Sequence, residues 1–165
     1  MKILVTGGLG YIGSHVVVEL IKENHEIIIL DNLINSSVSV LDQIETITKV
    51  KPDFEKIDLK KKGDVIGFFK KHKNIEGVIH FAALKSVSES VSRPIKYYEN
   101  NVIGMINLLE FMPKGIPLVF SSSCTVYGSS KTQPIDENTP FGIATSPYGH
   151  TKQICEQIME AEYKI

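Results

Sequence analysis

The sequence lacks tryptophan and long apolar runs, and it contains only two cysteines. Cys124 and Cys155 show no metal-ligand spacing, so we expect reduced thiols and no metal site. No stretch approaches the ~20 apolar residues that a membrane-spanning helix needs. The N-terminus has one lysine before a short apolar run and does not resemble a signal peptide. These absences predict a cytoplasmic protein without a membrane partner.

An excess of charge of either sign is also absent. Lysine and arginine number 18 against 19 aspartate and glutamate residues, for a net charge of −1. This balance predicts no nucleic-acid partner. Hydrophobic residues make up 42% of the sequence and charged residues 22%, which is typical of globular proteins. With 165 residues, the chain is expected to fold as one domain over residues 1–165.

Short apolar runs alternate with helical patterns along the chain. The runs are rich in β-branched residues and lack polar alternation, as expected of strands buried on both faces of a parallel sheet. They lie at residues 3–5, 27–30, 54–57, 78–81 and 118–120. Alternation of strands and helices predicts an α/β fold with right-handed crossovers. We therefore expect a doubly wound, Rossmann-type parallel sheet of about five strands and five helices.

The fourth predicted helix, residues 95–112, is apolar on nearly all sides. A helix of this kind is normally buried on more than one side. One side should cover the sheet. The other side packs either against a second copy of the chain, giving a homodimer through the fourth and fifth helices, or inside the protein.

A glycine-rich segment follows the first predicted strand. The segment Gly8-Leu9-Gly10-Tyr11-Ile12-Gly13 fits the pattern G-x-G-x-x-G, and Gly7 directly precedes it. Between a strand and a helix, such glycines let backbone N–H groups approach a dinucleotide pyrophosphate at the helix N-terminus. The pattern alone also fits a plain glycine-rich turn.

An acidic residue in the right place favours the dinucleotide interpretation. Asp31 ends the second predicted strand, where a carboxylate can bind the adenosine ribose hydroxyls. A carboxylate there repels a 2′-phosphate, and no arginine follows in residues 32–35. The expected cofactor is therefore NAD rather than NADP, although Asp31 could merely cap a turn.

Tyr148 and Lys152 are four residues apart at the start of the last predicted helix, so they share a face. A phenol ordinarily loses its proton near pH 10, and a nearby ammonium group favours the phenolate. The pair therefore suits abstraction of an alcohol proton, although this spacing is common by chance. The packing stripe of the helix is expected elsewhere, at Ile154, Ile158, Ala161 and Ile165.

Three serines end the fifth predicted strand, at residues 121–123. Carboxyl ends of parallel strands face the ligand crevice in doubly wound sheets. A hydroxyl there can hydrogen-bond the substrate oxygen whose proton leaves. Chemistry alone leaves the choice among the three serines open.

Taken together, these segments resemble the extended short-chain dehydrogenase/reductase superfamily and, within it, the UDP-glucose 4-epimerase family. The matching residues are 6–15, 30–33, 80–90, 97–102, 120–128 and 146–152. The glycine-rich loop marks only the superfamily. The segments Phe81-Ala82-Ala83-Leu84-Lys85 and Ser121-Ser122-Ser123-Cys124-Thr125-Val126-Tyr127-Gly128 are much more specific.

The resemblance implies a role for each matching residue. Tyr148 would be the catalytic base, Lys152 its electrostatic partner and ribose ligand, and Ser123 the hydroxyl that faces the substrate. NAD would contact Gly7, Gly10, Tyr11, Ile12, Gly13, Asp31, Asn32, Asp58, Leu59, Phe81, Ala82, Lys85, Asn100, Tyr148 and Lys152.

The implied reaction interconverts UDP-glucose and UDP-galactose through transient oxidation at the sugar C4. Related dehydratases carry Asp-Glu where this chain has Cys124-Thr125, which argues against dehydration. Family members are roughly twice as long, so the resemblance implies a chain cut before its UDP-sugar-binding part and poorly active alone. The alternatives are a non-catalytic NAD-binding or self-associating module, or another NAD-dependent nucleotide-sugar epimerase or dehydrogenase.

Overall fold

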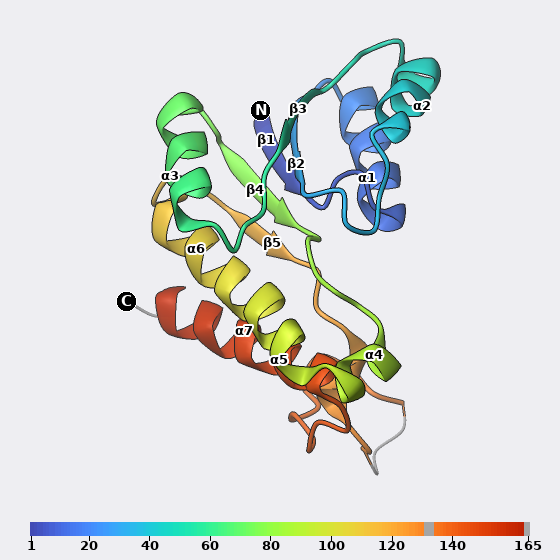
Figure 1. Ribbon diagram of the computed structural model, residues 1–165, viewed down its shortest axis with the longest axis vertical. Coiled ribbons are helices and arrows are strands. Elements are labelled where there is room, and N and C mark those ends of the chain that lie inside the picture. Colours follow the sequence, from blue (N-terminus) through green and yellow to red (C-terminus); the bar gives the residue numbers. More distant parts are fainter. Residues whose placement is uncertain (131–133, 164–165) are drawn as a thin grey trace. The chain divides into compact units, whose positions relative to one another are not determined.

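A computed structural model describes residues 1–130 and 134–163. Its strands form one parallel sheet in the order β3-β2-β1-β4-β5 (Figure 1). They are β1 (Lys2–Thr6), β2 (Glu26–Asp31), β3 (Asp53–Lys56), β4 (Gly77–His80) and β5 (Leu118–Phe120). The doubly wound parallel sheet predicted from the sequence is confirmed.

The helices differ from the prediction in detail. They are α1 (Tyr11–Lys22), α2 (Ser39–Thr48), α3 (Lys62–Lys71), α4 (Val87–Ser92), α5 (Pro94–Tyr97), α6 (Gly104–Phe111) and α7 (Pro147–Tyr163). The predicted helix 95–112 is divided into α5, the π-helix η1 (Tyr98–Ile103) and α6, which follow one another without a gap. The six-residue α4 was not predicted because V-S-E-S-V-S is too short, with only two apolar residues, to show a helical pattern.

The chain divides into two compact units. The first comprises Met1–Ala82 with Asn107–Ser121, and it contains the whole sheet. The second comprises Ala83–Ile106 with Ser122–Ile165, and it contains α4, α5, η1, the short 3-10 helix η2 (Cys124–Tyr127) and α7. The assignment of residues 1–165 to a single domain stays a prediction.

The central strands β1 and β2 of the first unit are buried on both faces. On one face Ile3, Val5, Ile27 and Ile29 join a core cluster that includes residues of α1 and α2. Leu4 and Ile28 alternate with them along the strands and are fully buried as well. Because both faces are covered, the central strands need apolar residues at successive positions.

The second unit is organised around α7, which packs against α4, α5, η1 and η2. Its buried side chains include those of Thr151, Lys152, Gln153 and Cys155. The predicted packing stripe is therefore wrong: Ile154 and Ile158 are half-buried and Ala161 is exposed, while Ile165 lies outside the described residues. Hydrophobicity was a poor guide here because this helix buries polar groups.

Over residues 1–130 and 134–163, none of the helices has the length and apolar character that crossing a membrane requires.

Candidate functional site

The glycine-rich loop of the first unit turns tightly into α1. Gly10 N–H donates to Gly7 O at 3.0 Å, and Ser14 N–H donates to Gly10 O at 2.9 Å. The first N–H groups of a helix have no acceptor within the helix. In the described chain no side chain caps α1, and Tyr11 and Ile12 in its first turn are exposed. A helix N-terminus left open in this way can bind an anion.

Gly13 brings α1 close to the loop. A Cβ at this position would lie 2.3 Å from Gly7 O and 2.9 Å from Gly8 Cα. Both neighbours are backbone atoms, so a side chain cannot be accommodated without moving the helix. Gly13 is therefore required for the close approach of helix and loop.

Gly7 has a second close neighbour at the end of β4. Its φ of +68° lies in the left-handed region, and a Cβ would lie 2.7 Å from Ala82 N. Phe81 N–H donates to Thr6 O at 3.0 Å, and the Thr6 hydroxyl shares a 2.6 Å hydrogen bond with His80 Nδ1. These contacts place the predicted Phe81 and Ala82 beside the glycine-rich loop. Sequence reasoning missed the buried Thr6–His80 pair, since neither residue belongs to the glycine pattern.

Asp31 also lies against the loop. Leu9 N–H donates to its Oδ2 at 3.2 Å, while Leu33 N–H and the Ser36 hydroxyl donate to its Oδ1 at 2.9 and 2.8 Å. The residue is only 7% exposed. A carboxylate offers about four acceptor sites, so three donors leave capacity for one more. Its neighbour Asn32 accepts from Ile34 N–H at 3.1 Å, which closes the same turn.

Asp58 and Leu59 follow β3. Asp58 Oδ1 accepts from Lys60 N–H at 3.0 Å, a turn contact that the sequence could not distinguish from a ligand role. Leu59 is buried, and its carbonyl accepts from Asn107 Nδ2 at 2.7 Å. Asn107 is therefore an unpredicted residue that fixes this loop.

In the second unit, the structure brings Tyr148 and Lys152 together. The Lys152 ammonium nitrogen lies 5.9 Å from the centroid of the Tyr148 ring. Lys152 is only 3% exposed, whereas Tyr148 is half-buried. Burial lowers the pKa of Lys152 from 10.5 to about 8, against the opposing influence of Cys155 and Glu156. The amine is thus a buried cation at neutral pH, held next to a phenol.

The serines after β5 have different partners. Ser122 donates its hydroxyl hydrogen to the Glu156 carboxylate on α7. The Ser123 oxygen accepts from Thr125 N–H at 3.3 Å and from the Thr125 hydroxyl at 3.0 Å. Because both contacts use Ser123 as an acceptor, its own O–H remains a donor.

The segment that carries Ser123 packs against the start of α7. A Cβ on Gly149 would lie 3.2 Å from Thr125 O, so the helix approaches Thr125 closely. Thr125 is also the residue that contacts Ser123. Thr125 therefore links the predicted Ser123 to the first turn of α7 within the second unit.

Lys85 and Asn100 are two further predicted NAD contacts, both between β4 and α6. Lys85 is exposed, and Asn100 donates to Asn101 Oδ1 at 3.0 Å. Asn101, which the sequence did not indicate, is buried. It accepts from Leu84 N–H at 2.9 Å and donates to Leu84 O and to the Thr151 hydroxyl, both at 3.0 Å. It ties the segment after β4 to α7.

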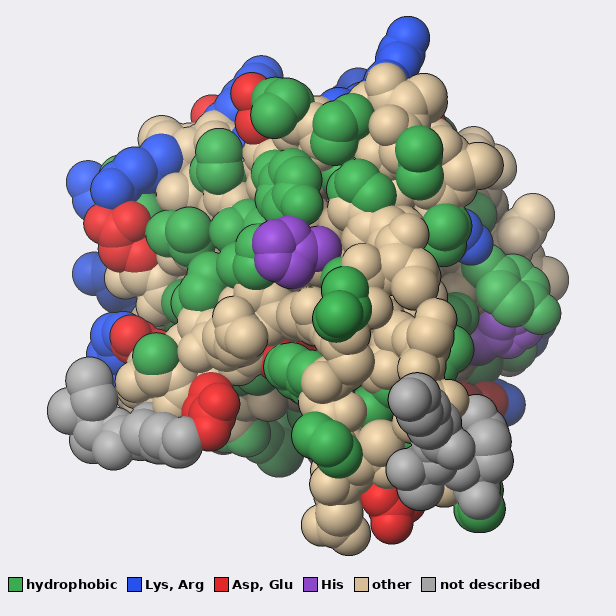
Figure 2. All heavy atoms as spheres, turned by 90° about the horizontal axis from the view of Figure 1, so that it is seen from below, with side chains coloured by type: hydrophobic (Ala, Val, Ile, Leu, Met, Phe, Trp, Pro, Cys, Tyr) green, Lys and Arg blue, Asp and Glu red, His purple; other side chains and the backbone are tan. Residues whose placement is uncertain are grey.

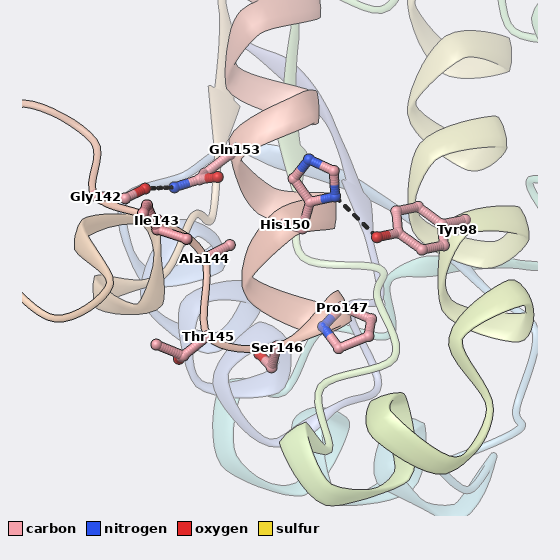
Figure 3. A pocket seen from close by; sticks show the side chains of 9 residues that line it. All are labelled: Tyr98, Gly142, Ile143, Ala144, Thr145, Ser146, Pro147, His150 and Gln153. Carbon is pink, nitrogen blue, oxygen red and sulfur yellow. Dashed lines mark hydrogen bonds between the residues drawn. The ribbon is translucent and has the colours of Figure 1, made fainter.

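A pocket of about 500 Å³ opens at the start of α7 (Figure 3). Tyr98 and His150 face each other there, with 2.8 Å between the tyrosine oxygen and Nδ1. On the other side Gln153 donates to Gly142 O at 2.8 Å. Its described lining contains none of the predicted site residues.

The predicted cofactor residues thus fall into both units, with the glycine-rich loop, Asp31 and Ala82 in the first and Tyr148 and Lys152 in the second. Over residues 1–130 and 134–163, no group of three or more His, Cys, Asp or Glu side chains could hold a metal ion. The groups available to bind or act on a ligand are the glycine-rich turn, the Asp31 carboxylate, and the Tyr148 phenol beside the buried Lys152 amine.

A glycine-rich turn after the first strand of a parallel sheet, followed by an acidic residue after the second strand, is typical of dinucleotide-binding proteins. The chain belongs to the NAD dependent epimerase/dehydratase family, whose model matches residues 3–164. Two of its relatives are named UDP-glucose 4-epimerase: one from Bacillus subtilis, 52% identical over 161 residues, and one from Dictyostelium discoideum, 47% identical over 161 residues. Each match covers 96% of this chain, and 47% and 46% of the respective relative.

Solved structures of UDP-glucose 4-epimerases also match this chain. A UDP-glucose 4-epimerase from Bifidobacterium longum in complex with NAD+ and UDP matches with a TM-score of 0.93 and 42% identity. The enzyme from Stenotrophomonas maltophila, with bound NAD and formylated UDP-arabinopyranose, gives 0.91 and 44%. Both matches cover 98% of this chain and 48% of the solved chain. The chain therefore spans about half the length of the relatives it matches.

Proposed function

We propose that this chain binds NAD and supplies the acid/base residues for interconversion of UDP-glucose and UDP-galactose. The observation that carries the proposal is the buried Lys152 beside the Tyr148 ring. The α1 N-terminus without a side-chain cap, after a glycine-rich turn, also supports it. The two solved relatives bind NAD or NAD+, and they carry UDP or a UDP-sugar.

The glycine-rich loop fits the pyrophosphate of NAD. Gly7, Gly10 and Gly13 keep the backbone clear of side chains, and the first turn of α1 directs N–H groups outward. Asp31 has one acceptor site for a ribose hydroxyl. We assign the remaining contacts to Tyr11, Ile12, Asn32, Asp58, Leu59, Phe81, Ala82, Lys85 and Asn100.

When bound, the nicotinamide supplies reversible acceptance of a hydride from the sugar C4. The Lys152 ammonium stabilises the phenolate form of Tyr148. This phenolate takes the proton of the 4-hydroxyl group and becomes a neutral phenol. Ser123 donates its hydroxyl hydrogen to the substrate oxygen, since its acceptor sites are engaged by Thr125. Ser122 is less suited to this role because its hydroxyl is bonded to Glu156.

Calorimetric titration of the 165-residue chain with NAD and with NADP tests the cofactor assignment. We expect NAD to bind and NADP to bind roughly tenfold more weakly or worse, because Asp31 faces the additional phosphate. Tyr148→Phe should leave NAD binding intact. Absence of NAD binding by a folded chain would overturn the proposal.

The reaction is tested by conversion of UDP-galactose to UDP-glucose. The relatives are about twice as long, and we expect turnover by the 165 residues alone to be slow. Any turnover should be lost in Tyr148→Phe. Rapid turnover would contradict the first expectation, and turnover that survives this substitution would refute the assigned base.

We also propose that the chain forms a homodimer through the fourth and fifth predicted helices, which correspond to α5, η1 and α6 and to α7. Ile103 and Ile106 are three residues apart and are 42% and 43% exposed. Figure 2 shows a face of the molecule on which hydrophobic side chains are numerous and basic side chains lie near the margins. Sedimentation analysis should show a dimer that Ile103→Glu weakens, whereas Ile47→Glu on α2 is a matched control at 61% exposure. Equal effects of the two substitutions would contradict this interface.

A further inference from the structure

Glu156 is not used in the proposed reaction, yet it lies next to the residues that are. It follows Lys152 by one turn of α7, a spacing that places two side chains on the same helix face. Its carboxylate accepts the Ser122 hydroxyl hydrogen, which fixes the carboxylate between α7 and the segment after β5. Glu156 is half-buried, so solvent screens its charge only in part.

We propose that Glu156 is a positioning residue: held by Ser122 one helical turn from Lys152, its carboxylate keeps the buried Lys152 side chain protonated beside Tyr148. This inference rests on the function proposed above. A buried amine tends to lose its proton, because burial disfavours the charged form. An anion fixed one turn away counteracts that tendency, and a neutral lysine could not stabilise a phenolate.

The charges around Lys152 support this assignment. Cys155 and Glu156 are two neighbours whose charge raises the pKa of Lys152. Burial raises the pKa of Cys155 to about 11, so its thiol is uncharged at neutral pH. Glu156 is therefore the one of these two that is negative under physiological conditions.

Titratable groups on the elements packed against α7 have contacts of their own. On α4 and α5, Glu89 accepts from Lys96 Nζ at 2.6 Å and from the Tyr97 hydroxyl at 2.9 Å. On η1, the Tyr98 hydroxyl pairs with His150, and Glu99 is exposed. The remaining groups are Arg93, which is exposed, and Cys124 and Tyr127 of η2.

The test follows the titration of Lys152 directly. In chain labelled with 15N and 13C at lysine, the Lys152 signal is the one missing from Lys152→Met. We expect its titration midpoint to fall by roughly one pH unit in Glu156→Gln, a tenfold loss in the ratio of ammonium to amine. Glu160→Gln, one turn further along α7 and exposed, should leave the midpoint unchanged.

Substitutions of Ser122 separate positioning from mere folding. Ser122→Ala should lower the midpoint by a smaller amount, and Ser122→Thr, which keeps the hydroxyl, should restore it. They also decide the question if Glu156→Gln does not fold. An unchanged midpoint in Glu156→Gln, or in Ser122→Ala where the former is unfolded, would overturn the inference. Failure of wild type to bind NAD would instead overturn the proposed function, and the titration would still report on Glu156.

Discussion

Replacement of Gly13 by alanine tests whether close contact between α1 and the glycine-rich loop builds the nucleotide site. The new Cβ would lie 2.3 Å from Gly7 O, about 1.1 Å short of the 3.4 Å at which ordinary contact begins. Both partners are backbone, so α1 and the loop must separate. Overpacking of this kind costs about 1–3 kcal/mol, while the better helix propensity of alanine returns up to about 1 kcal/mol.

Gly67→Ala is a control with the same chemical change. Gly67 lies inside α3, and a Cβ there would meet nothing within 4 Å. This variant should gain about 0.5–1 kcal/mol in its free energy of unfolding and bind NAD as wild type does. The two alanine variants are therefore expected to differ in stability by about 1–3 kcal/mol, with Gly13→Ala the weaker.

Urea unfolding measures the stabilities, and calorimetric titration measures NAD affinity. Displacement of the helix N-terminus should reduce NAD affinity in Gly13→Ala by at least about tenfold, which corresponds to about 1.4 kcal/mol. If Gly13→Ala matched Gly67→Ala in both measurements, the loop and helix would not be in the contact described, and the reasoning would be refuted.

Three further predictions concern the second unit. Folding lowers the pKa of Lys152 to about 8, so the protonated lysine opposes folding at pH 7. Lys152→Met should therefore raise the free energy of unfolding at pH 7 by about 1–3 kcal/mol. This gain in stability should fade as the pH rises from 8 to 10.5. A gain that is independent of pH would contradict burial as its cause. Asn101→Ala should cost about 2–4 kcal/mol in urea unfolding because it leaves Leu84 N–H and C=O without a partner; a loss below 1 kcal/mol would argue against these bonds. In mass spectrometry after maleimide treatment, native chain should carry one label, on the exposed Cys124, because Cys155 is buried and its pKa is raised to about 11; equal labelling of both thiols would show that α7 opens readily.

Much of the first unit could be predicted from local sequence. Ile27 to Leu30 form a continuous apolar run, and the structure buries all four residues inside the sheet. Gly13 and Asp31 were recognised because a strand, a tight turn and a helix must follow one another in a fixed order to bind a pyrophosphate. Residues 95–111 of the predicted helix 95–112 are indeed helical, as three consecutive segments, but the π-helical segment at residues 98–103 has no sequence signature.

Prediction failed where a residue's role depends on partners far away in sequence. Asn101 was passed over in favour of Asn100, although it is Asn101 that bonds Leu84 and Thr151. The choice among the serines after β5 was also open, and the structure gives Ser122 and Ser123 different partners. The stripe Ile154 and Ile158 was wrong because hydrophobicity identifies a buried face only when burial is driven by apolar groups.

The amino-acid sequence by itself determined the order of strands and helices, the glycine-rich turn and the spacing of Tyr148 and Lys152, because each depends on neighbours within a few residues. Only the tertiary structure decided that Lys152 is buried, that Glu156 is held by Ser122, and that Gly7 lies against Ala82. These properties depend on which distant segments exclude water from one another, and solvent exclusion is what converts an ordinary amine into a buried cation with a lowered pKa.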